Sequence, residues 1–339
     1  MDKTVLVTGG TGFVGAWCIV ELLRQGYRVR TTVRSAARQA GVRHAVAREI
    51  EPGDRLEFTI ADLTSDAGWA EAMTGCDYVL HVASPMTSAT ADPQALIAPA
   101  REGTLRVLKA AVDAGVQRVV MTSSCATVNQ GLQSGDTVND ETMWASENDP
   151  DLNAYRLSKI LAERAAWDFM REHGGATEFA TVLPSAIFGP VLTLDNPGSV
   201  QLVQRQLQGK MPGTPNVGFC VVDVRDLALA HVEAMRRPEA AGERFIVAGE
   251  FVWMRDVAAI LRQRLGERAA KVPTRGLPDW LVKLMGRFVP AMQQLVPMLG
   301  RRHLYRSDKA QRLLGYRPRP AADTLVECAE SLLVLEGRA

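Results

Sequence analysis

The chain has 339 residues, of which 47% are hydrophobic and 23% charged, with a formal net charge of +1. This length and composition allow a large buried core and suit one large domain or two closely associated ones. The near-neutral charge gives no reason to expect nucleic acid or a membrane surface as a partner. The five cysteines are scattered and lack C-x-x-C spacing. We therefore expect reduced thiols, no metal site and a cytoplasmic location.

The first 25 residues show a strand, a glycine-rich turn and a helix. Residues 5–7 are apolar, residues 8–15 read Thr-Gly-Gly-Thr-Gly-Phe-Val-Gly, and an apolar-periodic run follows to residue 25. Gly9, Gly12 and Gly15 lack a Cβ, so the chain can turn tightly and admit a pyrophosphate at the start of the helix. Between a strand and a helix, this spacing predicts dinucleotide binding.

The end of the second predicted strand, residues 27–33, indicates which dinucleotide is bound. An acidic side chain commonly stands there to bind the adenosine ribose of NAD. This strand is followed instead by Arg34, with Arg38 nearby. Guanidinium groups suit phosphate oxygens, so the pair predicts binding of the 2′-phosphate of NADP(H).

Three further strand ends supply candidate cofactor contacts. Residues 56–60 lead to Asp62, which is placed to accept a hydrogen bond from the adenine amino group, although an acid at a strand end is often only a turn former. Residues 78–81 run into a loop expected beneath the cofactor, and His81 within them is interpreted as a structural histidine. Residues 118–122 form a fifth strand that ends at Thr122.

The fifth strand is followed by Ser124, and Tyr155 and Lys159 come about thirty residues later. A separation of four places Tyr155 and Lys159 on one face of a helix. A nearby ammonium is expected to lower the phenol pKa, so that Tyr155 can exchange a proton with a substrate oxygen during hydride transfer. Ser124 would donate a hydrogen bond to the same oxygen. The three residues are the predicted catalytic set.

Together these motifs resemble those of the extended short-chain dehydrogenase/reductases, in the group of dihydroflavonol 4-reductase, cinnamoyl-CoA reductase and aldehyde or ketone reductases. The motifs include the glycine turn, Thr122-Ser123-Ser124, Tyr155-x-x-x-Lys159 and the stretch from Pro184 to Pro190. The resemblance implies NADP(H) contacts from the glycine turn and from the strand ends. The expected contacts are Gly9, Thr11, Gly12, Phe13, Val14, Gly15, Arg34, Arg38, Asp62, Leu63, Val82, Ala83, Ser84, Thr122, Tyr155, Lys159, Pro184, Ile187 and Ser199.

The predicted fold is α/β, a doubly wound parallel sheet with a smaller C-terminal substrate-binding lobe. We expect an NADP-binding domain over residues 1–185, which also recruits about 219–248, and a lobe formed mainly by residues 186–339. The predicted reaction is NADPH-dependent reduction of an aldehyde or ketone, with a flavanonol-like or aromatic carbonyl as one option. Two alternatives stay open: an epimerase, dehydratase or hydroxysteroid-type dehydrogenase of the same fold, and a non-catalytic dinucleotide-sensing regulator.

The substrate pocket is the least determined part of the sequence. Its expected wall residues are Met86, Cys125, Asn129, Phe188 and Phe219. The expected partner is a small carbonyl compound or alcohol. A homodimer is common on this fold, but no surface in the sequence identifies an interface.

Overall fold

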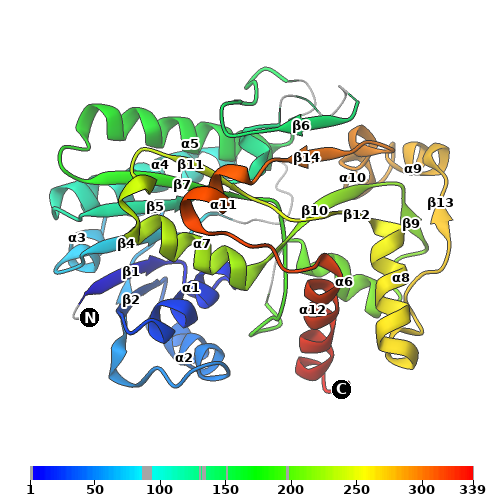
Figure 1. Ribbon diagram of the computed structural model, residues 1–339, viewed down its shortest axis with the longest axis horizontal. Helices are drawn as coiled ribbons and strands as arrows, with labels where there is room; N and C mark the ends of the chain where they lie inside the picture. The colour runs from blue at the N-terminus through cyan, green and yellow to red at the C-terminus, as the bar shows by residue number, and fades with distance from the viewer. Residues whose placement is uncertain are drawn as a thin grey trace.

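The computed structural model describes residues 3–85, 94–129, 131, 135–149, 152–195 and 198–338. Within these ranges the largest sheet has seven strands, and all of its pairings are parallel (Figure 1). The predicted doubly wound sheet is confirmed. Its strands, in spatial order, are β11 (Arg244–Val247), β7 (Glu178–Pro184), β5 (Arg118–Thr122), β4 (Tyr78–His81), β1 (Thr4–Thr8), β2 (Arg28–Val33) and β3 (Leu56–Ile60).

The order of the strands creates the place where a ligand can enter. From β1 the chain moves outward through β2 to β3, and then returns to place β4 on the other side of β1. The loops after β1 and β4 therefore separate at the carboxyl edge of the sheet, where open parallel sheets bind their ligands.

Helices cover both faces of this sheet (Figure 1). One face carries α1 (Phe13–Arg24), α2 (Gln39–Ala47) and α7 (Val224–Arg236). The other carries α3 (Trp69–Met73), α4 (Gln94–Asp113) and α5 (Ala154–His173). Their apolar sides face the strands, which explains why the central strands β1, β4 and β5 read as mostly apolar runs.

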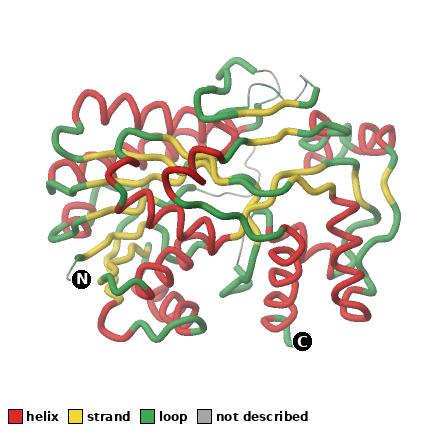
Figure 2. Tube along the Cα trace, in the orientation of Figure 1, coloured by secondary structure: helices red, strands yellow, loops and turns green. Residues whose placement is uncertain are grey.

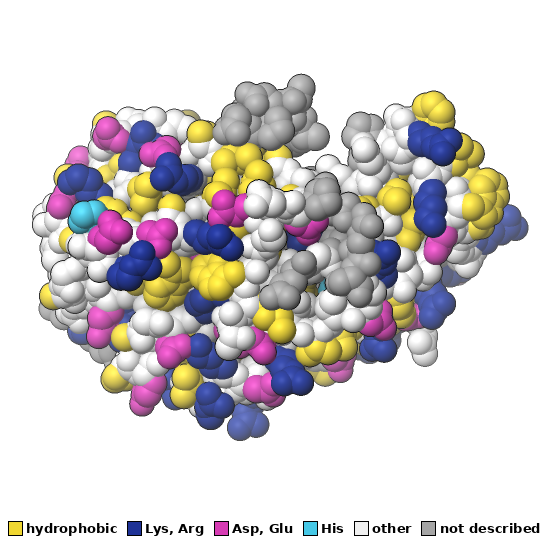
Figure 3. All heavy atoms as spheres, turned by 90° about the horizontal axis from the view of Figure 1, so that it is seen from above, with side chains coloured by type: hydrophobic (Ala, Val, Ile, Leu, Met, Phe, Trp, Pro, Cys, Tyr) yellow, Lys and Arg dark blue, Asp and Glu magenta, His cyan; other side chains and the backbone are white. Residues whose placement is uncertain are grey.

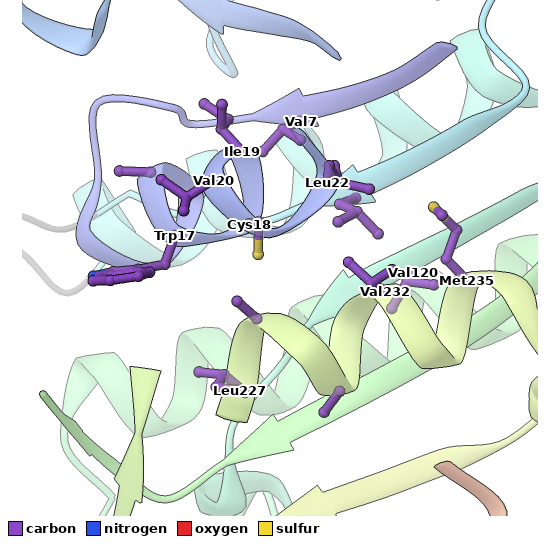
Figure 4. Close-up of a cluster of buried hydrophobic side chains, with 14 of the residues drawn as sticks. Val7, Trp17, Cys18, Ile19, Val20, Leu22, Val120, Leu227, Val232 and Met235 are labelled. Atoms are coloured by element: carbon purple, nitrogen blue, oxygen red, sulfur yellow. The ribbon is translucent and has the colours of Figure 1, made fainter. Parts of the chain in front are cut away.

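The contact between α1 and α7 joins distant parts of the chain. Trp17, Cys18 and Leu22 of α1 face Leu227 and Met235 of α7 (Figure 4). All five are buried, with exposed fractions of 2% or less. Burial of an aliphatic side chain of this size stabilises a fold by about 1.5–3 kcal/mol. The N-terminal half is therefore stabilised by a helix that follows residue 223.

A second hydrophobic core lies in the C-terminal part, where Figure 2 shows helices beside short strands. It gathers α6 (Val200–Leu207), α8 (Met254–Leu265) and α12 (Ala321–Leu335) against a small sheet of order β12-β10-β8. The strands are β8 (Ala186–Phe188), β10 (Gly218–Asp223) and β12 (Phe251–Trp253), with β8 and β10 parallel and β12 antiparallel to β10.

Two-stranded pairings complete the described strands. β6 (Thr137–Asn139) pairs with β14 (His303–Tyr305), and β9 (Thr214–Pro215) pairs with β13 (Gly276–Leu277). The remaining α-helices in the described ranges are α9 (Asp279–Met285), α10 (Pro290–Gln293) and α11 (Asp308–Leu314). In the described part of the chain, no helix is long and apolar enough to span a membrane.

The surface carries charges of both signs. On the face shown in Figure 3, Lys and Arg side chains are interspersed with Asp and Glu over much of the larger lobe. Hydrophobic side chains gather with basic ones at the end where Figure 1 places α9. Trp280 and Leu284 of α9, and Phe288 just beyond it, are exposed there.

Candidate active site

The glycine turn after β1 lies against the loop after β4. Gly9 has a φ of +75°, and a Cβ on it would lie 2.9 Å from the Cα of Ala83. A Cβ on Gly15 would lie 2.3 Å from the carbonyl oxygen of Gly9. Gly9 is thus required for its backbone angle and for the close approach of the two loops. Gly15 is required because α1 packs against the turn.

The start of α1 has the properties of a phosphate site. Gly12 is its N-cap and, having no side chain, makes no capping hydrogen bond within the described residues. The first N–H groups of an α-helix have no intrahelical partner, and the helix dipole favours negative charge at this end. The turn therefore fits a pyrophosphate, and its contact with the cofactor stays a prediction.

A cavity of about 260 Å³ adjoins this turn, and its lining includes Thr11, Gly12, Phe13, Arg38 and Asp195. Arg38 Nη1 lies 3.9 Å from Asp195 Oδ2, and both side chains are mostly exposed, at 59% and 86%. An exposed ion pair of this kind contributes at most about 1 kcal/mol. A phosphate could therefore replace Asp195 as the partner of Arg38 at little cost.

Arg34 and Asp62 lie near each other at the ends of β2 and β3. Arg34 is exposed. Hydrogen bonds from the N–H and hydroxyl of Thr64 lower the pKa of Asp62 below its ordinary value, and the charge of Arg34 lowers it further. Both Thr64 groups donate to Asp62 Oδ1. Asp62 is thus a turn former in this structure, and its contact with adenine stays a prediction.

Ser124 and Tyr155 meet at the carboxyl edge of the sheet. Ser124 follows β5 and caps a short 3-10 turn, where its Oγ accepts a hydrogen bond from the Ala126 N–H at 3.1 Å. Tyr155 lies in the first turn of α5, which begins after the N-cap Asn153. Desolvation raises the pKa of the Tyr155 phenol above 10, and a hydrogen bond with Ser124 partly offsets this. The phenol is therefore protonated at neutral pH.

Lys159 lies one helical turn beyond Tyr155 and is buried, with 6% of its surface exposed. Burial lowers the pKa of Lys159 to about 8, opposed by the negative charge of Glu163. Among the described residues its Nζ donates one hydrogen bond, to the Thr122 carbonyl oxygen at 3.5 Å. An ammonium carries three N–H donors, so this buried group fits the hydroxyls of a bound ribose.

The expected effect of Lys159 on the phenol is not observed. The sequence predicts that the ammonium lowers the pKa of Tyr155, whereas desolvation raises that pKa above its ordinary value. Lys159 Nζ hydrogen-bonds to the Thr122 carbonyl oxygen, and the phenol pKa is set by desolvation, Ser124 and Cys125. In this state Tyr155 is suited to donate a proton.

A cavity of about 600 Å³ opens beside Ser124 and Tyr155. Its lining includes Cys125, Asn129, Pro184, Ser199 and Phe219, all of which the sequence analysis names. Arg156, His303 and Tyr305 also line it. Those three are missing from the predicted site. His303 and Tyr305 belong to β14, a short strand placed by tertiary pairing with β6, whereas Arg156 directly follows Tyr155 in α5.

One predicted wall residue is wrong and another cannot be placed. Phe188 is fully buried and stacks on Phe219, with ring centroids 5.4 Å apart, so it belongs to the second core and not to the cavity. Phe188 packs in the second core with Val191, Val200 and Val203, which leaves none of its side chain at the cavity. Met86 lies outside the described residues.

The remaining predicted contacts fall into two groups. Ala83, Val82 and Ser84 lie in the half-buried loop after β4. Four others already contact the protein. The Thr122 hydroxyl lies 2.7 Å from His231 Nε2, and Leu63 lies against Gly103. Val14 and Ile187 pack against the core of the sheet. Their contacts with a cofactor stay predictions.

His81 is a structural residue, as expected. It is buried, its Nδ1 lies 2.9 Å from Thr8 Oγ1, and its Nε2 lies 3.4 Å from Thr104 Oγ1. Burial and the charge of Lys159 lower the pKa of His81 to about 3. The imidazole is therefore neutral at physiological pH.

The sequence analysis also missed the ion pair behind the site. Glu163, one turn beyond Lys159, has no exposed surface and accepts from Arg244 Nε at 2.9 Å and from Ser123 Oγ at 2.6 Å. Arg244 also donates to the carbonyl oxygens of Glu141 and Met143. The i, i+4 spacing from Lys159 to Glu163 is the signal that could have indicated a paired, buried acid.

The sequence model of the NAD dependent epimerase/dehydratase family matches residues 5–249. The chain belongs to this family. Within it the chain is an extended short-chain dehydrogenase/reductase, as its motifs indicate.

Its relatives in the family include plant reductases. Cinnamoyl-CoA reductase 1 of Oryza sativa subsp. japonica is 39% identical over 268 residues, which cover 77% of this chain and 75% of the rice protein. An anthocyanidin reductase of Vitis vinifera is 36% identical over 289 residues, covering 80% and 83%. The yeast methylglyoxal/isovaleraldehyde reductase Gre2, solved in complex with NADPH, superposes with a TM-score of 0.82 at 25% identity, covering 99% of this chain and 100% of Gre2.

Among the described residues there is no group of three or more His, Cys, Asp or Glu side chains that could hold a metal ion. The described site consists of phosphate-binding backbone, hydroxyl groups and an ammonium. These groups suit a dinucleotide and a proton-accepting substrate oxygen.

Proposed function

We propose that this member of the family is an NADPH-dependent carbonyl reductase that converts an aldehyde or ketone to the alcohol. The observation that carries the proposal is that Ser124 and Tyr155 line the same cavity of about 600 Å³, with Lys159 one helical turn beyond Tyr155. The names of the plant relatives support a reductase, and that of the yeast methylglyoxal/isovaleraldehyde reductase supports a carbonyl substrate.

Each residue of the set has a separate task. When bound, the cofactor supplies the hydride that adds to the carbonyl carbon. Tyr155 donates its proton to the carbonyl oxygen, and the raised pKa of the phenol keeps that proton in place at neutral pH. Ser124 donates a hydrogen bond to the same oxygen and polarises it. Lys159 supplies N–H donors that can bind the nicotinamide ribose.

The choice of NADPH over NADH follows from Arg34 and Arg38. β2 ends without the acid that would bind a ribose 2′-hydroxyl and repel a 2′-phosphate. Both arginines lie just beyond its carboxyl end, and Arg38 lines the cavity beside the glycine turn. They are the residues to which we assign the 2′-phosphate.

The test follows NADPH absorbance with purified protein and a panel of aromatic, aliphatic and flavanonol carbonyls. Tyr155→Phe should lower kcat by about 10²–10⁴-fold, because a positioned general acid contributes this much, while NADPH binding persists. Arg34→Ala with Arg38→Ala should raise KM for NADPH by about tenfold or more, since charged hydrogen bonds are lost. Arg48→Ala removes an exposed arginine of the same lobe and serves as the control.

Two outcomes would contradict the proposal. A preference for NADH would remove the role given to Arg34 and Arg38. Binding of NADPH without turnover of any carbonyl would favour an epimerase-like enzyme or a dinucleotide-sensing regulator.

A further inference from the structure

A second group of polar side chains lines the substrate cavity beside the catalytic candidates. Arg156 comes from α5, Asn129 from the loop after β5, and His303 and Tyr305 from β14. Arg156 Nη2 donates to the Asn129 carbonyl oxygen at 3.3 Å, and Asn129 Nδ2 donates to the Tyr305 hydroxyl at 3.4 Å. The group is therefore a connected wall.

His303 is the member of this wall with an unused hydrogen-bonding atom. Its side chain is buried, with 5% exposed, and Nδ1 lies 2.9 Å from Thr137 Oγ1. Its Nε2 has no hydrogen-bond partner in the described part of the chain. Buried polar atoms normally have partners, so an unpaired one in a cavity wall indicates a place for a ligand atom.

The neighbours of His303 indicate that Nε2 is a donor. Asn139 Nδ2 donates to Thr137 Oγ1 at 3.1 Å, which leaves the proton of the Thr137 hydroxyl available for His303 Nδ1. In a neutral imidazole the proton is then on Nε2. Burial and the charges of Arg156 and Arg301 lower the pKa of His303 and keep it neutral, although Asp136 opposes them.

Arg156 contributes a guanidinium to this wall. It is buried, with 7% exposed, and its charge acts on His303. Guanidinium groups bind carboxylates through a planar pair of donors. A ligand group beside Arg156 and His303 must therefore accept hydrogen bonds, and negative charge on it would be favourable.

We propose that Arg156 and His303 form a subsite for a carboxylate, so that the enzyme prefers aldehydes or ketones that also carry a carboxylate. This rests on the proposed carbonyl reductase function. His303 donates one hydrogen bond from Nε2, Arg156 supplies the positive charge, and the polar wall holds the substrate while its carbonyl group reaches Ser124 and Tyr155. The subsite selects the substrate and takes no part in the proton transfer.

The experiment compares matched substrates. Wild-type protein is assayed with NADPH on 3- and 4-carboxybenzaldehyde, on the corresponding methyl esters, and on succinic semialdehyde against its methyl ester. We expect kcat/KM for at least one acid to exceed that for its ester by about tenfold or more, because a charged hydrogen-bonded contact is worth this factor. Arg156→Gln and His303→Phe should each lower that ratio, mainly through KM, with a smaller loss in Arg156→Lys.

The control is Arg306→Gln, which removes an exposed positive charge just beyond β14 and should leave the ratio unchanged. If acids and esters are reduced equally well by the wild type, or if the preference survives in both variants, the subsite assignment is wrong and the carbonyl reductase function stands.

A second readout separates the subsite from the reaction itself. Calorimetric titration of the NADPH complex with 3- and 4-carboxybenzyl alcohol, the products of the assay, measures carboxylate binding without turnover. Tighter binding than for the methyl ester alcohols, lost in His303→Phe, would support the subsite even if no carbonyl in the panel were reduced. Equal binding of acid and ester would overturn it. Arg156→Lys provides the measurement if Arg156→Gln fails to fold.

Discussion

His81 and His231 make the stability of the protein depend on pH in a range where few other groups titrate. Both are buried, and burial lowers the pKa of His81 to about 3 and that of His231 to about 4. An unfolded histidine has a pKa near 6.5. Between these values the unfolded chain binds protons that the folded chain does not, so stability falls as the pH falls from about 6.5 to about 4.

We therefore expect each histidine to remove up to about 1.4 kcal/mol of unfolding free energy per pH unit within this window. Denaturant titrations at pH 7, 6 and 5.5 would measure the change of unfolding free energy with pH. These pH values lie above those at which most carboxylates titrate. His231→Gln should reduce the slope, whereas His44→Gln, at an exposed position, should leave it unchanged. A stability that is constant from pH 7 to 5.5 would show that the buried imidazoles take up protons without unfolding.

At the scale of single residues, what could be predicted depends on sequence separation. The glycine turn and the pair Tyr155 and Lys159 are local patterns, so the chemistry that needs them is visible in a short window. His303 and Arg156 are 147 positions apart in the sequence and share a wall through tertiary structure, in which β14 pairs with β6 and contacts Cys220 of β10. No pattern within a short stretch of sequence predicts this arrangement.

At the scale of elements, Glu163 and Arg244 join α5 to the edge strand β11. Arg244 begins β11, donates to Glu163 and holds the loop of Glu141 and Met143. Its guanidinium also lies 3.6 Å from the centre of the Trp144 ring. Glu163 in turn accepts from Ser123, next to the catalytic candidate Ser124. This buried pair therefore fixes the distance between α5 and the loop after β5.

Glu163→Gln should destabilise the protein by about 3–5 kcal/mol, because it leaves the buried Arg244 charge without its partner. Glu147→Gln removes the exposed partner of Arg164 and should cost no more than about 1 kcal/mol. Thermal and urea unfolding would compare the two variants. A similar, small loss in both would mean that Arg244 finds adequate partners in the loop carbonyls.

The same substitution has a kinetic signature. Burial lowers the pKa of Lys159 to about 8, and the negative charge of Glu163 opposes this by raising it. Without Glu163 the ammonium should lose its proton at lower pH, so the alkaline limb of the kcat/KM profile should move to lower pH. A purely structural role would lower stability without moving this limb.

Element prediction succeeded where burial produces a long apolar pattern. The central strands β1, β4 and β5 are almost entirely buried, so each reads as a mostly apolar run close to its observed bounds. β6 and β14 have three residues each and contain polar side chains, and the sequence shows only a polar loop at β6. Such short strands are determined by their tertiary pairing and not by local preference.

At the scale of the whole molecule, the N-terminal half cannot complete its own core. The face of α1 that carries Trp17 and Leu22 is covered by α7, and the edge of β7 is covered by β11. The same core includes Leu314 and Tyr316, near the C-terminus. Trp17 Nε1 also donates to the carbonyl oxygen of Pro190, at 2.8 Å. All of these partners come after residue 185, where the sequence suggests a domain boundary.

A fragment of residues 1–185 should therefore fail to fold cooperatively, although it contains the glycine turn and all three catalytic candidates. It would expose the apolar face of α1 and the unpaired edge of β7, both of which favour association with other chains. Circular dichroism, thermal unfolding and NADPH titration of the fragment beside the full chain would test this. The full chain should show one transition that NADPH moves to higher temperature, because a ligand stabilises the state that binds it. A fragment with its own sharp transition and measurable NADPH binding would show that the N-terminal part is an autonomous domain, and that α7 and β11 add stability to a core that is already complete.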